Sequence, residues 1–171
     1  MSMRHAVQFY NDDVFLVDAV SAFIKAGYEG KATPIVVATE KHRQDLRKTF
    51  QEWGNPGLVS KVMLYDASEL LSTFMVEGWP SQAKFNSSVG RMVEEAALRG
   101  PVHIYGEMVA VLWAEGKTRA AIHLEELWNE LATRHTFSLL CGYPISAFPN
   151  QNTDESLQQV CHAHTHVHIP G

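Results

Sequence analysis

A chain of 171 residues, of which 46% are hydrophobic, can bury the core of one globular domain and is short for two. Its 14 basic and 19 acidic residues give a net charge of −5, so it lacks the basic surface that nucleic acid or an anionic membrane would attract. We therefore predict a single domain, residues 1–171, with no direct nucleic-acid or membrane partner.

The N-terminal residues lack the apolar core of a signal peptide, and no apolar run is long enough to span a bilayer. We therefore expect a cytoplasmic protein. Its two cysteines, Cys141 and Cys161, do not form a disulfide framework, and we expect both to be reduced.

Five short apolar runs alternate along the chain with longer segments of helical periodicity. The run at residues 34–38 is apolar throughout, which is typical of a strand covered on both faces in a parallel sheet. The expected strands lie at residues 5–9, 34–38, 62–65, 102–105 and 137–141. We predict one doubly wound α/β domain with a mainly parallel sheet of about five strands and helices on both faces.

Two helical patterns, at residues 67–76 and about 81–99, separate the third expected strand from the fourth. A crossover needs only one helix. Two interpretations stay open for the surplus segment 77–80, which contains Trp79: a mobile lid, or a piece packed against its own domain, as is more usual for tryptophan.

A carboxylate, Glu107, follows directly after the fourth strand and its turn at Gly106. One explanation is favourable interaction with the dipole of the next helix. The other is ligand binding, because ligands of parallel α/β sheets bind at the carboxyl ends of the strands. Glu125 shares a helix side with Trp128 and is a second candidate buried carboxylate, with solvent exposure as the alternative. The candidate ligand-binding residues are Tyr10, Asn11, Asp66, Tyr105, Glu107, Glu125, Trp128, Cys141 and Tyr143.

No phosphate-binding loop is present, because the segment after the first strand lacks the glycines that wrap a polyphosphate. The triplet at residues 116–118, Gly-Lys-Thr, follows a helix, and Val111 stands where the leading glycine of that motif would be. The strand ends also offer no Lys or Arg for a phosphate. We therefore expect no ATP hydrolysis and no cofactor.

An enzyme is the main alternative. Cys141 would be its nucleophile, with His103 or His5 as base, or Glu107 would be a general base. A strand-end cysteine in an apolar run is more often an inert core residue, and we do not predict catalytic residues.

A final helix is expected from Thr153 to about Cys161, followed by a His-rich tail, so residues 156–171 comprise most of this helix and the tail. Histidines alternate there, and the pair Cys161 and His164 has a spacing that can ligate zinc. The segment lacks a second cluster of ligands. We therefore expect a frayed terminus that is dispensable for folding, with Cys161 and His164 as weak metal candidates only.

Five segments, HAVQFY, YGEMVAVLW, LEELWNEL, FSLLCGY and CHAHTHV, together resemble the MEDS family, the methanogen/methylotroph sensory domain, over almost the whole chain. The resemblance implies a degenerate relative of the RecA-like circadian-clock ATPases that serves as an input domain for small organic ligands. It marks His5, Phe9, Tyr10, Tyr105, Gly106, Glu107, Glu125, Trp128, Asn129, Cys141, Tyr143, Cys161 and His164.

We therefore expect a ligand-sensing signal-input domain with a pocket at the carboxyl ends of the strands. Family members occur beside output modules, so this chain would signal to a separate partner, a histidine kinase or a transcription regulator. The sequence leaves a homodimer open. The alternatives are the enzyme described above and a nucleotide-binding remnant that holds a purine without hydrolysing it.

Overall fold

The computed structural model, which describes residues 4–148 and 155–170, contains one sheet of six parallel strands with the order β3-β2-β6-β7-β1-β8. This confirms the predicted α/β fold with a parallel sheet. The strands are β1 His5–Tyr10, β2 Thr33–Ala38, β3 Met63–Asp66, β6 Val102–Gly106, β7 Ser138–Pro144 and β8 His166–His168. A separate antiparallel pair is formed by β4 Met75–Val76 and β5 Trp79–Pro80.

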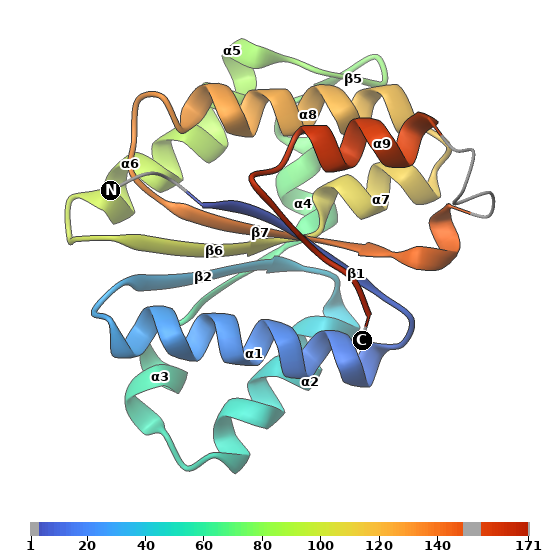
Figure 1. Ribbon diagram of the computed structural model, residues 1–171. Coiled ribbons are helices and arrows are strands. Elements are labelled where there is room, and N and C mark those ends of the chain that lie inside the picture. Colours follow the sequence, from blue (N-terminus) through green and yellow to red (C-terminus); the bar gives the residue numbers. More distant parts are fainter. Residues whose placement is uncertain (1–3, 149–154, 171) are drawn as a thin grey trace.

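Helices cover both faces of the sheet (Figure 1). One face carries α1 Asp13–Glu29, α2 Glu40–Glu52 and α3 Pro56–Lys61. The other face carries α4 Ala67–Ser72, α5 Gln82–Phe85, the π-helical turn η1 Asn86–Gly90, α6 Arg91–Ala97, α7 Met108–Ala114, α8 Thr118–Leu131 and α9 Glu155–His162. A 3₁₀ turn, η2 Ile145–Ala147, follows β7. None of the helices in the described part of the chain is long and apolar enough to cross a membrane.

Strand alternation creates two separate cores. Along β1, Val7 and Phe9 join the core beneath α8, whereas Ala6 and Tyr10 join the core beneath α1. Successive side chains of a strand point to opposite faces, so the two cores share the backbone and no side chains. Each polar side chain of a strand therefore lies on one face of the sheet or the other.

The C-terminal segment is part of the sheet, and the expectation of a frayed terminus was wrong. Strand β8 pairs in parallel with β1 and adds a sixth strand to the five predicted. The Thr165 amide donates to the His5 carbonyl at 2.7 Å, and the His5 amide donates to Thr165 Oγ1 at 2.9 Å. Helix α9 precedes this strand, and its expected start at Thr153 lies outside the described residues.

The segment at residues 77–80 forms the turn and second strand of the β4–β5 hairpin. Trp79 stacks on His123 of α8, with ring centroids 4.8 Å apart and an interplanar angle of 24°, and keeps 46% of its surface exposed. The hairpin is therefore packed against its own domain, through this aromatic pair, through Met75 and through the buried Pro80.

Deletion of residues 165–171 should destabilise the protein, because it removes β8 and the three hydrogen bonds that join Thr165 to His5. We expect the free energy of unfolding to fall by about 1–3 kcal/mol, at roughly 1 kcal/mol per hydrogen bond. Urea denaturation measures this loss. Deletion of residues 169–171, which leaves β8 intact, is the matched control, and equal stability of the two truncations would contradict the assignment.

Candidate functional site

Glu107 stands at the carboxyl end of β6, where its amide donates to the Val37 carbonyl of the neighbouring strand at 3.0 Å. Its carboxylate is buried and accepts three groups. His42 Nδ1 lies 2.8 Å from Oε1, the Tyr105 hydroxyl donates to Oε1 at 3.0 Å, and the Thr39 amide donates to Oε2 at 3.3 Å. Glu107 is therefore held by β6, by α2 and by the residue before α2.

His42 joins Glu107 to a second carboxylate. Its Nε2 lies 2.8 Å from Asp13 Oδ1, while its Nδ1 faces Glu107. A carboxylate only accepts, so both ring nitrogens carry protons and the ring is an imidazolium. Burial alone would lower the pKa of His42, but Glu107 and Asp13 outweigh it and raise this pKa to about 9. The hydrogen bond from His42 in turn lowers the pKa of Asp13.

Two tyrosines complete this cluster, and we call Tyr10, Asp13, His42, Tyr105 and Glu107 the Glu107 network. The Tyr10 ring meets the His42 ring edge-on, with centroids 6.3 Å apart. Burial and the charge of Glu107 raise the pKa of both tyrosines. The carboxylate of Glu107 is surrounded by its own partners, so the network fastens α1 and α2 to the strand ends.

The remaining rim candidates do not join this network. Asn11 is exposed in the short bend after β1. Asp66 accepts from the Glu69 amide at the start of α4 and forms a 2.8 Å ion pair with Arg43. The expectation of strand ends without a cation is therefore corrected by Arg43, which reaches Asp66 from α2.

A second polar cluster lies on the opposite face of the sheet, beneath α8. We call its members, His5, Glu125, Cys141, Tyr143 and His164, the Glu125 cluster. Glu125 Oε1 lies 3.3 Å from both His5 Nε2 and Cys141 Sγ. Its Oε2 lies 2.7 Å from His164 Nε2 and accepts from the Tyr143 hydroxyl at 3.2 Å. Glu125 is fully buried, which confirms the buried alternative for this carboxylate.

The charges of the Glu125 cluster are compensated internally. Burial would raise the pKa of Glu125, but His164 and His5 hold it well below its usual range. Burial raises the pKa of the Cys141 thiol, and the charge of Glu125 adds to this rise. Without a further cation Cys141 is a protonated thiol, which is a poor nucleophile. His5 lies 3.5 Å from this thiol, whereas His103, the other proposed base, stacks on Phe23 on the opposite face.

Trp128 is buried in an aromatic core, in edge-to-face contact with Phe85 at 5.4 Å. The nine candidate ligand-binding residues are thus not gathered at one place. Seven belong to the two polar clusters or to the core beneath α8, and Asn11 and Asp66 lie apart from them at strand ends. A single strand-end pocket that uses Glu107 together with Cys141 does not form, because β6 and β7 direct these residues to separate clusters. Whether any of the nine contacts a ligand stays a prediction.

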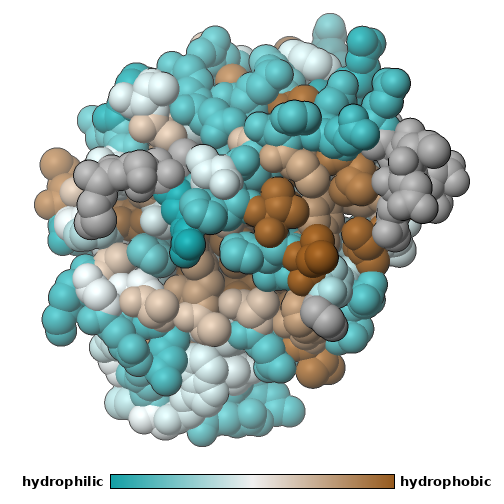
Figure 2. Space-filling view, viewed as in Figure 1, coloured by the Kyte–Doolittle hydropathy of each residue, from teal (hydrophilic) through white to brown (hydrophobic). Residues whose placement is uncertain are grey.

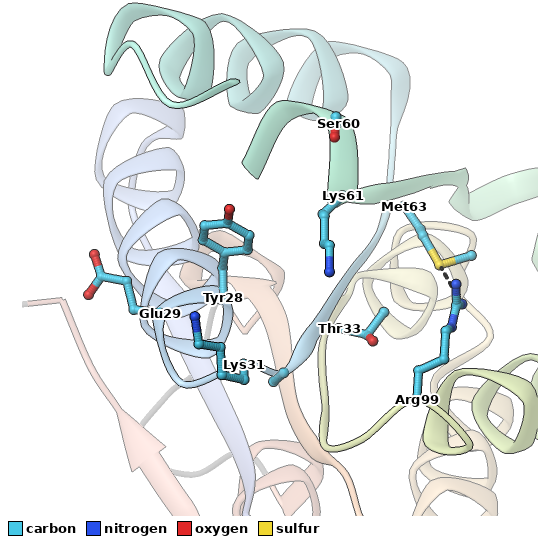
Figure 3. Close-up of a pocket in the computed structure, with 9 residues that line it drawn as sticks. Tyr28, Glu29, Lys31, Thr33, Ser60, Lys61, Met63 and Arg99 are labelled. Carbon is cyan, nitrogen blue, oxygen red and sulfur yellow. Dashed lines mark hydrogen bonds between the residues drawn. The ribbon is translucent and has the colours of Figure 1, made fainter. Parts of the chain in front are cut away.

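Several hollows lie elsewhere on the described part of the molecule, and two of them differ clearly in size and position. One, of about 770 Å³, is at the amino ends of β2 and β3, the edge opposite to Glu107 (Figure 3). The labelled side chains of Lys31, Lys61 and Arg99 surround it. The second, of about 300 Å³, lies between the β4–β5 hairpin, α8 and α9. It is lined by Trp79, Arg119, Ile122, His123, Glu126 and Gln159.

Sequence reasoning missed His42 and Asp13 as partners of Glu107. A signal was present, because both lie in the first turn of a helix that follows a strand, where side chains reach the strand ends. Of the two weak metal candidates, His164 is in the Glu125 cluster. Cys161 is a half-buried thiol outside it.

A family model described as MEDS, the methanogen/methylotroph, DcmR sensory domain, matches residues 4–165. The chain belongs to the MEDS family. The resemblance carried by five short segments is thereby confirmed, and membership assigns this MEDS domain a sensory, signal-input role. A search of curated proteins gave no match.

The first βα connection of this MEDS domain agrees with the predicted lack of a phosphate-binding loop. Only Asn11 and Asp12 separate β1 from α1, and Asp12 accepts from the Phe15 amide. A carboxylate thus occupies the helix start where a phosphate would bind. Lys117, in the Gly-Lys-Thr triplet, lies 3.3 Å from Glu115 after α7.

Replacing Glu107 with Gln should remove a pH-dependent part of the stability. A folded-state pKa of about 9, raised from 6.5, means that the His42 contribution is fully present below pH 6.5 and is lost as the pH rises through 9. We expect Glu107→Gln to cost about 1–3 kcal/mol at pH 6 and clearly less at pH 10.

Urea denaturation of both proteins at the two pH values measures this difference. Glu52→Gln, which changes an exposed carboxylate at the end of α2, is the control and should be nearly neutral. A loss of stability that is the same at pH 6 and pH 10 would show that His42 is not charged in the folded protein.

Proposed function

We propose that this MEDS domain binds a small organic molecule and passes the signal to a separate output protein, a histidine kinase or a transcription regulator. The observation that carries this proposal is the hollow between the β4–β5 hairpin, α8 and α9. It combines an exposed aromatic surface with convergent polar groups, as small-molecule sites do.

The lining of this hollow fits a small molecule with an apolar body and one or two polar handles. Trp79 and Ile122 supply apolar surface, while Arg119 and Glu126 supply hydrogen-bonding groups of opposite charge. A volume of about 300 Å³ is at the lower end of the range for ligand pockets. The Glu107 network is a poorer candidate, because its carboxylate already accepts three groups.

Helix α9 connects the hollow to the C-terminal strand. Gln159 lines the hollow, and the next residue, Val160, accepts a hydrogen bond from His164 at its carbonyl. Two residues beyond His164 the chain enters β8. A ligand that binds more tightly to one position of α9 would therefore favour one conformation of β8 over another. A sensor requires such a difference in affinity between two conformations.

In the sheet formed by residues 4–148 and 155–170, β8 is the last strand at one edge, which suits it to contact a partner. Val167 and Ile169 are 43% and 71% exposed. Figure 2 shows hydrophobic side chains gathered on the face where the C-terminal segment crosses the molecule. Edge strands with exposed apolar residues readily pair with another chain. We propose this edge as the surface that the output protein reads.

Trp79→Ala should abolish binding at the hollow and leave the fold intact, because Trp79 is half-exposed. The probes are benzyl alcohol, phenol and indole, tested by thermal shift. A probe at about 100 times its dissociation constant should add roughly 2.7 kcal/mol of stability, and the variant should lose this increment.

Trp53→Ala is the matched control, since Trp53 is similarly exposed but packs on Phe50 at the end of α2, on the opposite face of the sheet. It should keep the response to the probes. Responses that survive Trp79→Ala and vanish in Trp53→Ala would contradict the proposed location.

A further inference from the structure

Four side chains of types that bind metal ions converge inside the Glu125 cluster. They are His5 of β1, Glu125 of α8, Cys141 of β7 and His164, which lies between α9 and β8. Their candidate ligand atoms all lie within 4.8 Å of one another, and all four residues are buried. Two imidazoles, a carboxylate and a thiol are the ligand types that zinc takes from proteins.

Hydrogen bonds outside the cluster fix which nitrogen each histidine presents to it. The Asn129 amide nitrogen donates to the Ala163 carbonyl at 2.9 Å, so its oxygen faces His5 Nδ1 at 2.7 Å and makes this nitrogen a donor. His164 Nδ1 donates to the Val160 carbonyl at 2.5 Å. Both rings therefore direct Nε2 at Glu125, and a metal-ligating histidine is held by its other nitrogen in the same way.

Direct hydrogen bonding within the cluster is incomplete. Among the described residues, His164 Nε2 is a buried ring nitrogen without a hydrogen-bond partner of acceptable geometry, although Glu125 Oε2 lies only 2.7 Å away. A neutral Nε2 and a carboxylate oxygen are both acceptors and repel each other. A cation between them, either a proton or a metal ion, is required.

The spacing of three of the ligand atoms fits a metal ion. Around a tetrahedral zinc, nitrogen, oxygen and sulfur ligands are separated by about 3.3–3.8 Å, given bond lengths of roughly 2.0–2.3 Å. The three distances that join Cys141 Sγ, His5 Nε2 and Glu125 Oε1 are 3.5, 3.3 and 3.3 Å. These three atoms already form one face of such a tetrahedron. His164 Nε2 lies within 4.8 Å of all of them and would supply the apex after a small shift.

Charge balance also favours a divalent metal ion. A divalent ion with one thiolate, one carboxylate and two neutral imidazoles has no net charge, which suits a buried site. The metal also replaces the thiol proton, because coordination deprotonates cysteine. We propose that His5, Glu125, Cys141 and His164 form a four-coordinate site for a divalent metal ion of the zinc class, which fastens the C-terminal segment to the sheet.

This site goes beyond the proposed binding of an organic molecule and does not depend on it. Its ligands come from both ends of the described chain, so metal binding cross-links β1 to the segment that leads into β8. Cys161 takes no part, because it lies outside the set of ligand atoms. The exposed His166 and His168 take no part either.

Cobalt(II) tests the site, because a cobalt–thiolate bond has its own near-ultraviolet charge-transfer absorption. The full chain is unfolded, treated with a chelator, and refolded with reductant and either cobalt(II) or zinc(II). We expect one metal ion per chain, a charge-transfer band, a higher melting temperature and slower hydrogen exchange at residues 164–168. Absence of a thiolate band in the folded, cobalt-treated protein would overturn the proposal in favour of a proton shared by His164 and Glu125.

Cys141→Ser should remove the band and weaken metal binding by at least roughly 10–100-fold, the loss typical even of residues that only support a ligand. Cys161→Ser is the matched control and should keep both. If Cys141→Ser does not fold, the band in Cys161→Ser alone identifies Cys141, since the chain has two cysteines. Metal binding that survives Cys141→Ser but is lost in the double variant His166→Gln, His168→Gln would also overturn the proposal.

Discussion

The buried carboxylate of Glu125 imposes the constraint around which the structure is arranged. Burying a charge in a core costs several kcal/mol unless it is paired and hydrogen-bonded. Its partners come from β1, from β7 and from the turn after α9, so each of these segments must reach its place before the charge is compensated. The requirement ties α8 to the centre of the sheet and to the C-terminal segment at one point.

Strand alternation decides how this constraint relates to the second carboxylate, Glu107. Tyr105 of β6 points to the face beneath α1, where it meets Glu107, while Cys141 and Tyr143 of β7 point to the face beneath α8. The two carboxylates are separated by the sheet backbone. The Glu107 network holds helices to the rim of the sheet, and the Glu125 cluster holds the C-terminal segment, so a perturbation of one need not disturb the other.

The regular part of the fold could be predicted because local patterns determine it. The apolar run at residues 34–38 predicts a strand buried on both faces, and the lack of glycines after β1 predicts a connection without a phosphate-binding loop. Strand β8 could not be predicted in this way. Its side chains are exposed, so His166, Val167 and His168 lack the apolar alternation of a half-buried strand, and its pairing with β1 depends on a contact 160 residues away in sequence.

The sequence predicted several residues of the two polar clusters but did not predict how these residues are arranged. Glu107, Glu125, Cys141 and Tyr143 were chosen from position and residue type, and they are buried in polar clusters. Their division between two faces depends on the register of β6 and β7, which periodicity alone does not give. His42 and Asp13 lie in the first turns of helices that follow strands, a position that marks them as candidates but does not pair them with Glu107. His164 is far from Glu125 in sequence, and spacing along the chain does not show that the two side chains meet.

Strand β1 lies between β7 and β8, so both of its neighbours are made late in synthesis. During translation His5–Tyr10 leaves the ribosome long before residues 138–144 and 166–168 exist. Until then its backbone hydrogen-bonding groups have no native partner and can pair with other chains. A sheet closed by such distant contacts should fold slowly, because a long loop must be ordered before the contacts compensate its entropy. Production of this domain is therefore expected to be sensitive to chaperones and to the rate of translation near residue 168.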